Sequence, residues 1–173
     1  MTNVAQIQSE LADREAIREC LYRYCRGIDR RDPDILRTAY WPDAIDTHLS
    51  FKGNIEEFIA WAMPTMKTMT NHQHHITNMI INLDGATAKA ESYFWSCVVQ
   101  GDPRHDRVGG GRYLDRFERR DGEWRIIERF VISDWFRQFD TACDYRNARA
   151  GTPPEAIGRG DQQDLSYTML GLV

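Results

Sequence analysis

The sequence lacks a long apolar run. No uninterrupted hydrophobic stretch approaches the roughly 20 residues that a membrane-spanning helix needs. The opening residues, MTNVAQIQSELADREAI, have neither the basic start nor the apolar centre of a secretion signal. We therefore expect a cytoplasmic protein that has no membrane partner.

Cysteine is scarce, and the basic residues form no patch. The 22 basic and 26 acidic side chains are interspersed and leave a net charge of −4, so no nucleic-acid partner is expected. The cysteines form neither a CxxC pair nor a zinc-finger spacing, which favours reduced thiols in a cytoplasm. They are Cys20, Cys25, Cys97 and Cys143.

The composition that is present suits one globular domain. The chain has 173 residues, of which 42% are hydrophobic, and this is enough for a sizeable core. Residues 6–26 predict an amphipathic helix, and Gly27 is its expected stop. The buried stripe of this helix is Ile17, Leu21, Tyr24 and Ile28.

Two shorter helices are predicted next. In RDPDILRTAY, Asp32 can cap the first amides and Pro33 suits the first turn, while Pro42 is expected to end the helix. In GNIEEFIAWAM, Asn54 and Glu57 have the spacing of a capping pair. The apolar stripe of this third helix is Ile55, Phe58, Ile59 and Ala62.

Strands dominate the second half. AIDTHLSF is a short strand candidate between the second and third helices, and further strands follow from His74 onward. The pairs Asp84-Gly85 and Asp121-Gly122 join consecutive runs and predict hairpins. The glycines of VGGGR lack the context of a nucleotide-binding loop and are interpreted as a loop or bulge. Helices followed by antiparallel strands define an α+β fold.

Two features predict contact with another subunit. We expect the last strand to carry apolar side chains on both faces, one covered by helices and the other by a second copy of the chain. Residues 1–150 form the expected main domain, and residues 151–173 an extension that docks on its own or a neighbouring subunit. On one face of the last strand we place Trp124, Ile126, Phe130 and Ile132, and on the other Ile127, Arg129 and Val131.

Residues 71–78, NHQHHITN, hold three of the five histidines. If this segment enters a strand, His72 and His74 share one face and His75 lies on the other. A zinc site, a proton-transferring base and histidines that only pack are the competing interpretations. Zinc usually takes at least three protein ligands, and the remaining candidates are scattered through the sequence. They are His48, His105, Asp46 and Asp29.

The base interpretation needs a carboxylate beside the imidazole, because the carboxylate holds one ring nitrogen and stabilises the charge formed at the other. Asp29 is a candidate, since it follows the first helix where a side chain can turn into a pocket between helices and sheet. A turn or capping role for Asp29 is the plain alternative.

Three segments together resemble the SnoaL-like branch of the nuclear transport factor 2-like superfamily over about residues 12–136: YRYCRGIDRRDPDILRTAYWPDA, HHITN and GGGRYLDRFERRDGEWRIIERF. The resemblance implies a cone-shaped α+β fold, in which a curved antiparallel sheet and about three N-terminal helices enclose a pocket. Within the branch, the pattern is similar to bile acid 7α-dehydratase, scytalone dehydratase and hexachlorocyclohexane dehydrochlorinase.

The resemblance also implies site residues. His74 would be the base and Asp29 its carboxylate, while Tyr24 and Arg129 would stabilise the departing oxygen or an enolate. Tyr24 stands where the dehydrochlorinase has a lysine and the bile acid dehydratase a tyrosine, which favours an oxygen leaving group. Cys97 stands near a further acid of the bile acid enzyme, which argues against a steroid. From the residues alone, Tyr24 can equally be core, and Arg129 can equally pair with an acid such as Glu91 or Asp134.

The expected function is a cofactor-independent lyase without a metal. It would remove water from a small to medium, largely apolar, hydroxylated ring or ketone by proton abstraction at the His74–Asp29 dyad. An isomerase or cyclase uses the same base. A non-catalytic ligand-binding protein, or a structural subunit like the β subunit of a ring-hydroxylating dioxygenase, is the alternative from another class. We expect a homo-oligomer, either a dimer or a trimer.

Overall fold

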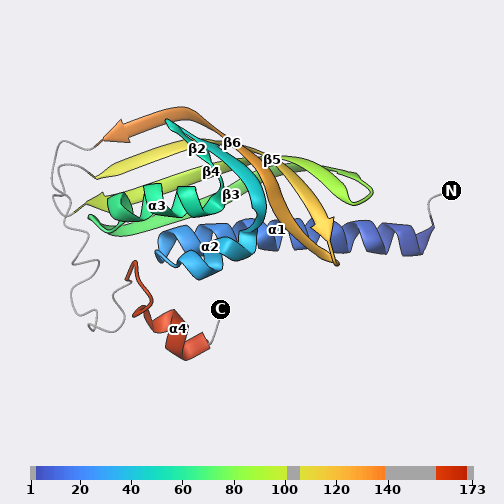
Figure 1. The fold of residues 1–173 in the computed structure, drawn as a ribbon, viewed down its shortest axis with the longest axis horizontal. Coiled ribbons are helices and arrows are strands. Elements are labelled where there is room, and N and C mark those ends of the chain that lie inside the picture. The colour runs from blue at the N-terminus through green and yellow to red at the C-terminus, as the bar shows by residue number, and fades with distance from the viewer. Residues whose placement is uncertain (1–2, 101–105, 139–158, 171–173) are drawn as a thin grey trace.

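The protein is seen in a computed structural model that describes residues 3–100, 106–138 and 159–170. The described residues form a six-stranded sheet and four helices. The sheet is curved and unclosed, and helices α1, α2 and α3 lie along one of its faces (Figure 1). The predicted α+β class, with three N-terminal helices, is confirmed.

The first two helices meet at a glycine. Helix α1 spans Val4–Asp29, so it does not stop at Gly27 as expected. Gly27 serves close packing instead: a Cβ at this position would lie 2.8 Å from Leu36 in α2. Helix α2 spans Pro33–Ala39, and Asp32 caps it as predicted. It ends before Pro42, which lies in the following strand, so the assignment of Pro42 as its terminator was wrong.

Helix α3, Ile55–Met66, begins at a capping box. The side chain of Asn54 accepts from the Glu57 amide, and the Glu57 carboxylate accepts from the Asn54 amide, as the spacing predicted. Ile55, Phe58 and Ala62 of the predicted stripe are buried, while Ile59 is half-buried.

The sheet has the strand order β2-β1-β6-β5-β4-β3. Both predicted Asp-Gly hairpins are present, joining β3 to β4 and β5 to β6. The only departure from antiparallel pairing within this sheet is between β1 and β6, which run parallel. The strands are β1 Tyr40–His48, β2 Phe51–Gly53, β3 Met69–Asp84, β4 Thr87–Gln100, β5 Arg107–Arg120 and β6 Glu123–Gln138.

A bulge in β6 overturns the expected assignment of its faces. Ile126 pairs with Phe117 and Glu128 pairs with Arg116, so Ile127 has no partner on β5. An extra residue reverses the alternation of side chains beyond it. Trp124 and Ile126 are therefore buried before the bulge, whereas Arg129 and Val131 are buried after it. The predicted face of Trp124, Ile126, Phe130 and Ile132 was wrong, because Phe130 points outward and is 51% exposed.

The described part of the C-terminal extension contacts its own chain. Helix α4, Leu165–Leu170, carries Tyr167, whose hydroxyl donates to Asp32 at 2.8 Å. The Arg31 guanidinium donates to the carbonyl of Gly160. Exchange of the extension between subunits stays a prediction, and residues 139–158, with Cys143, lie outside the described residues. None of the helices in the described ranges combines the length and apolarity needed to cross a membrane.

Candidate active site

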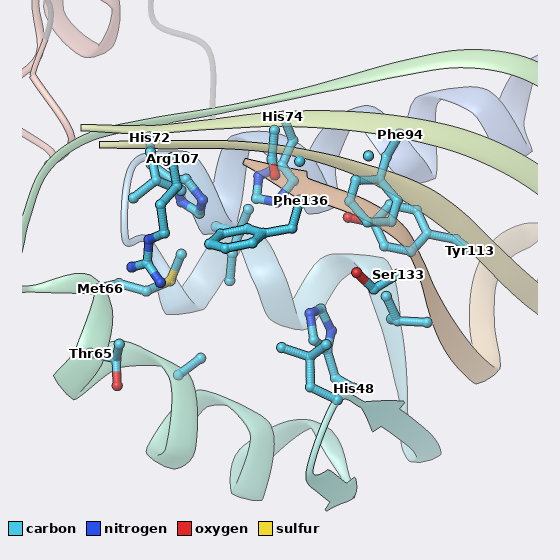
Figure 2. Close-up of a pocket in the computed structure, with 18 of the residues that line it drawn as sticks. His48, Thr65, Met66, His72, His74, Phe94, Arg107, Tyr113, Ser133 and Phe136 are labelled. Carbon is cyan, nitrogen blue, oxygen red and sulfur yellow. The ribbon is translucent and has the colours of Figure 1, made fainter. Parts of the chain in front are cut away.

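A cavity of about 380 Å³ opens between the inner face of the sheet and helices α1 and α3 (Figure 2). Most of its wall is apolar and comes from aromatic and aliphatic side chains such as Phe58, Trp61 and Val131. A volume of this size suits a small organic ligand. The polar side chains in the wall are Tyr24, His48, Thr65, His72, His74, Ser96, Arg107, Tyr113 and Ser133.

His74 and Asp29 are joined by two hydrogen bonds, although 45 positions separate them. The Nδ1 of His74 lies 2.7 Å from one Asp29 oxygen, and the His74 backbone amide donates to the other at 2.8 Å. Asp29 ends α1 and His74 lies on β3, so the contact fixes the helix against the sheet. An ionised carboxylate can only accept, so Nδ1 carries the proton and Nε2 keeps a lone pair. His74 lines the cavity and Asp29 does not.

His72 lies beside His74, as the alternation predicted, and its ring meets that of His74 edge-on at 4.5 Å. His75 is on the opposite face beside Trp95. Burial is the main cause that lowers the pKa of His72 to about 2, and the nearby guanidinium groups of Arg107 and Arg31 act in the same direction. His72 is therefore neutral at physiological pH, and its buried Nδ1 has no hydrogen-bond partner among the described residues.

Tyr24 and Tyr113 form the wall next to the dyad. The Tyr24 ring lies 6.4 Å from the His74 ring and 5.6 Å from the Tyr113 ring. Burial raises the pKa of both phenols well above the usual range, so both stay protonated. The two hydroxyls adjoin each other, and neither makes a hydrogen bond of normal geometry to any residue in the described ranges. Tyr113 was not singled out in the sequence.

Arg129 lies behind these two rings and does not line the cavity. Its guanidinium carbon is 4.1 Å from the Tyr24 ring centre and 4.0 Å from that of Tyr113. Two hydrogen bonds of 2.7 and 2.8 Å join it to Asp115, and both side chains are fully buried. The expected partners Glu91 and Asp134 were wrong, since both pair with Arg112 instead.

His48 lies on the opposite side of the cavity from His74 (Figure 2). Its Nδ1 is 3.7 Å from Asp46, which accepts from the Tyr40 hydroxyl at 2.6 Å. Burial is the main cause that lowers the pKa of His48 to about 3 and raises the pKa of Asp46 to about 6. Alternation along AIDTHLSF places Asp46 and His48 on one face, which is the sequence signal for this pair.

A metal ion would find three donors at one point. Asp29, His72 and His74 each offer an atom, and these atoms lie within 4.8 Å of one another. Two histidines with one carboxylate are a ligand set that divalent metals accept. The sequence placed Asp29 among scattered candidates, and the structure brings it to both histidines. His48 and Asp46 lie apart from this group, and His105 lies outside the described residues.

Residues 9–129 match the model of the SnoaL-like domain. Uncharacterized proteins of Mycobacterium bovis and Mycobacterium tuberculosis are 29% identical over 125 residues, which cover 70% of this chain and 85% of theirs.

Two solved structures share the fold. A proposed scytalone dehydratase of Novosphingobium aromaticivorans superposes with a TM-score of 0.70 at 18% identity, covering 79% of this chain and 94% of that one. A hexachlorocyclohexane dehydrochlorinase gives 0.69 at 20% identity, covering 84% and 96%. At such identities the match concerns the fold alone.

Proposed function

Because this chain belongs to the SnoaL-like domain family, and because its cavity presents an imidazole held by a carboxylate, we propose that it is a lyase of the dehydratase type. Its substrate would be a largely apolar, hydroxylated ring that carries a ketone or another group able to acidify a neighbouring C–H bond. The hydrogen bond of 2.7 Å between His74 and Asp29, at the wall of an open cavity, is the observation that carries the proposal.

His74 would take the proton. In the proposed step, Nε2 removes the proton next to the carbonyl and the electron pair forms the C=C bond. The C–O bond at the β carbon breaks as the departing oxygen takes a proton from the hydroxyl of Tyr24 or Tyr113, so that water leaves. Asp29 holds Nδ1–H and stabilises the imidazolium that forms. Support comes from the position of Asp29 behind His74, where it orients the ring without facing the substrate.

Tyr24 and Tyr113 would supply protons or hydrogen bonds to the substrate oxygens on which negative charge develops. Their unpaired hydroxyls can donate to the departing oxygen or to the enolate, and such donors often make the largest contribution to catalysis. Arg129 would act through these rings. A cation held against both rings favours negative charge on the phenol oxygens, so we assign it a positioning and electrostatic role without substrate contact.

The test uses 3-hydroxy-1-tetralone, a bicyclic β-hydroxyketone that yields fluorescent 1-naphthol after losing water. Relative to the unaltered protein, His74→Ala and Asp29→Asn should lower the enzymatic rate by about 10²–10⁴-fold, the usual contribution of general-base catalysis. His75→Ala is the matched control, because His75 is the next residue on the same strand but faces away from the cavity. Equal rates for the His74 and His75 variants would refute the dyad.

A metal-dependent hydrolase is the second candidate, favoured by the grouping of Asp29, His72 and His74. In that case, purified protein would contain about one equivalent of a divalent metal by elemental analysis, and His72→Ala would lower that content. A metal-free protein that turns over the tetralone would support the lyase. Deuterium uptake next to the carbonyl without loss of water would favour an isomerase.

A further inference from the structure

Arg107 is the one arginine or lysine among the described residues that line the cavity. It opens β5, and its guanidinium passes His72 and reaches toward Met66 of α3 (Figure 2). The described residues that line the cavity include no aspartate and no glutamate. The two other titratable bases in the wall with shifted pKa values, His48 and His72, are held neutral by burial. The positive charge of Arg107 therefore faces a cavity without a compensating charge on its wall.

Within the described ranges, Arg107 has no hydrogen-bond or ion-pair partner, and its Nε is buried without an acceptor. Other arginines that have a buried nitrogen without an acceptor are hydrogen-bonded or ion-paired through another nitrogen. Arg129 is paired with Asp115, and Arg31 donates to the carbonyls of Met66 and Met69. Removing a guanidinium from water without giving it a new acceptor costs free energy. An anionic ligand that accepts hydrogen bonds from Arg107 would recover this cost and bind strongly.

The strand register places this cation one row from the proposed base. His72, Val98 and Arg107 are cross-strand neighbours in one row, and His74, Ser96 and Gly109 form the next row on the same face. The two rows are about 7 Å apart along the strands, because each residue of a strand advances roughly 3.4 Å. Arg107 and His74 line the same cavity, so one ligand can contact both side chains.

We propose that the ligand of this cavity is a ring acid whose carboxylate binds Arg107, while its apolar ring lies toward His74. A single cation without a second charge or a glycine-rich loop suits a monoanion, and a planar guanidinium matches a carboxylate with two parallel hydrogen bonds. If the protein is the proposed lyase, its substrate would be a hydroxy acid or a keto acid. The binding of the anion, however, does not depend on turnover.

The experiment is calorimetric titration of the full-length protein with 2-naphthoate, 2-naphthyl phosphate and 2-naphthalenemethanol. These probes share one ring system and differ in charge. We expect 2-naphthoate to bind at least about tenfold more tightly than the alcohol, as charge-assisted hydrogen bonds usually contribute about 10- to 150-fold. Arg107→Met should remove this difference while leaving the affinity for the alcohol unchanged. Tighter binding of the phosphate than of the carboxylate would overturn the assignment of a monoanion.

Arg116→Met is the matched control, because Arg116 lies on the same strand but is exposed and pairs with Glu128. It should not change the affinity for 2-naphthoate. Equal affinities of the unaltered protein for 2-naphthoate and the alcohol would refute the proposal, whether or not Arg107→Met folds. His74→Ala should still bind 2-naphthoate, so loss of the lyase hypothesis and loss of the anion site give different results.

Discussion

Replacing Asp115 by alanine should destabilise the fold far more than an equally short ion pair at the surface would suggest. Asp115 and Arg129 are both fully buried, and the carboxylate accepts two hydrogen bonds of 2.7 and 2.8 Å. In the variant, the guanidinium would remain in the core against the rings of Tyr24, Tyr40 and Tyr113, without the carboxylate that now pairs with it. Breaking one partner of a buried pair leaves an uncompensated charge.

The expected loss is about 3–5 kcal/mol in the free energy of unfolding, the usual consequence of removing one member of a buried ion pair. For a chain of this length, each kcal/mol shifts the melting temperature by about 2–4 °C. The melting temperature should therefore fall by about 6–20 °C.

Urea unfolding followed by circular dichroism measures this loss, and Asp134→Ala is the control. Asp134 also makes a two-pronged pair, with Arg112 at 3.0 and 3.1 Å, but the two side chains are 36% and 29% exposed. Solvent screens such a pair, so about 0–1 kcal/mol is expected. If Asp115→Ala costs no more than Asp134→Ala, the argument from burial is wrong.

A double variant separates structure from catalysis at the same place. Arg129→Met with Asp115→Leu removes both charges, and apolar replacements of a buried pair are often close to neutral for stability. The double variant should therefore be more stable than Asp115→Ala. If Arg129 also favours negative charge on Tyr24 and Tyr113, the folded double variant should still turn over 3-hydroxy-1-tetralone more slowly. An unchanged rate would leave Arg129 with a structural role only.

Three further predictions concern packing, pH and assembly. Gly27→Ala should destabilise the protein by about 1–3 kcal/mol in thermal unfolding, because the alanine Cβ would lie 2.8 Å from Leu36. Alanine is the better helix former, so a gain in stability would show that helix propensity outweighs this close contact. His48 has a pKa of about 6.5 in the unfolded chain and about 3 in the folded protein, so the unfolded chain takes up a proton first as the pH falls. The free energy of unfolding should therefore decrease as the pH drops from about 6.5 toward 3, by about 2 kcal/mol at pH 5. His48→Phe should lose less stability than the unaltered protein in urea unfolding at pH 5 relative to pH 7, and an equal loss would argue against a buried neutral His48. Phe130→Glu on the exposed sheet face should convert the expected homo-oligomer to monomers in sedimentation velocity, and an unaltered oligomer would place the interface elsewhere.

Local chemistry made part of the fold predictable. The caps at Asp32 and Asn54 and both Asp-Gly hairpins were read from short motifs because their interactions join neighbouring residues. The faces of His72, His74 and His75 followed from strand alternation for the same reason. Gly27 shows the limit of such rules. Glycine is common at helix ends, but here it lies inside α1, where the lack of a side chain lets α1 pack closely against Leu36 of α2.

The proximity of Asp29 to His74 had no local signal. Their hydrogen bonds depend on how α1 lies against β3. The place of Asp29 after the first helix made it one candidate, and the resemblance to a family paired it with His74. Asp115 was missed as the partner of Arg129 for a related reason, since the two residues lie opposite each other only in the β5–β6 register. Asp46 and His48 differ from these cases, because alternation within one short strand could have placed them together, although from the sequence they were treated as scattered candidates.

The burial of Arg129 depends on one residue of β6. With strict alternation, Arg129 would share a face with Arg125 and Ile127, and Phe130 would share one with Trp124 and Ile126. The unpaired Ile127 shifts the side chains that follow it, as far as Ser133, to the other face, so Arg129 points into the core behind Tyr24 and Phe130 points outward. The bulge therefore does two things at once: it places a cation behind the phenols of the proposed site, and it leaves an aromatic side chain on the outer face. A pattern of hydrophobic residues cannot reveal this shift, because Ile127 is apolar and suits either face.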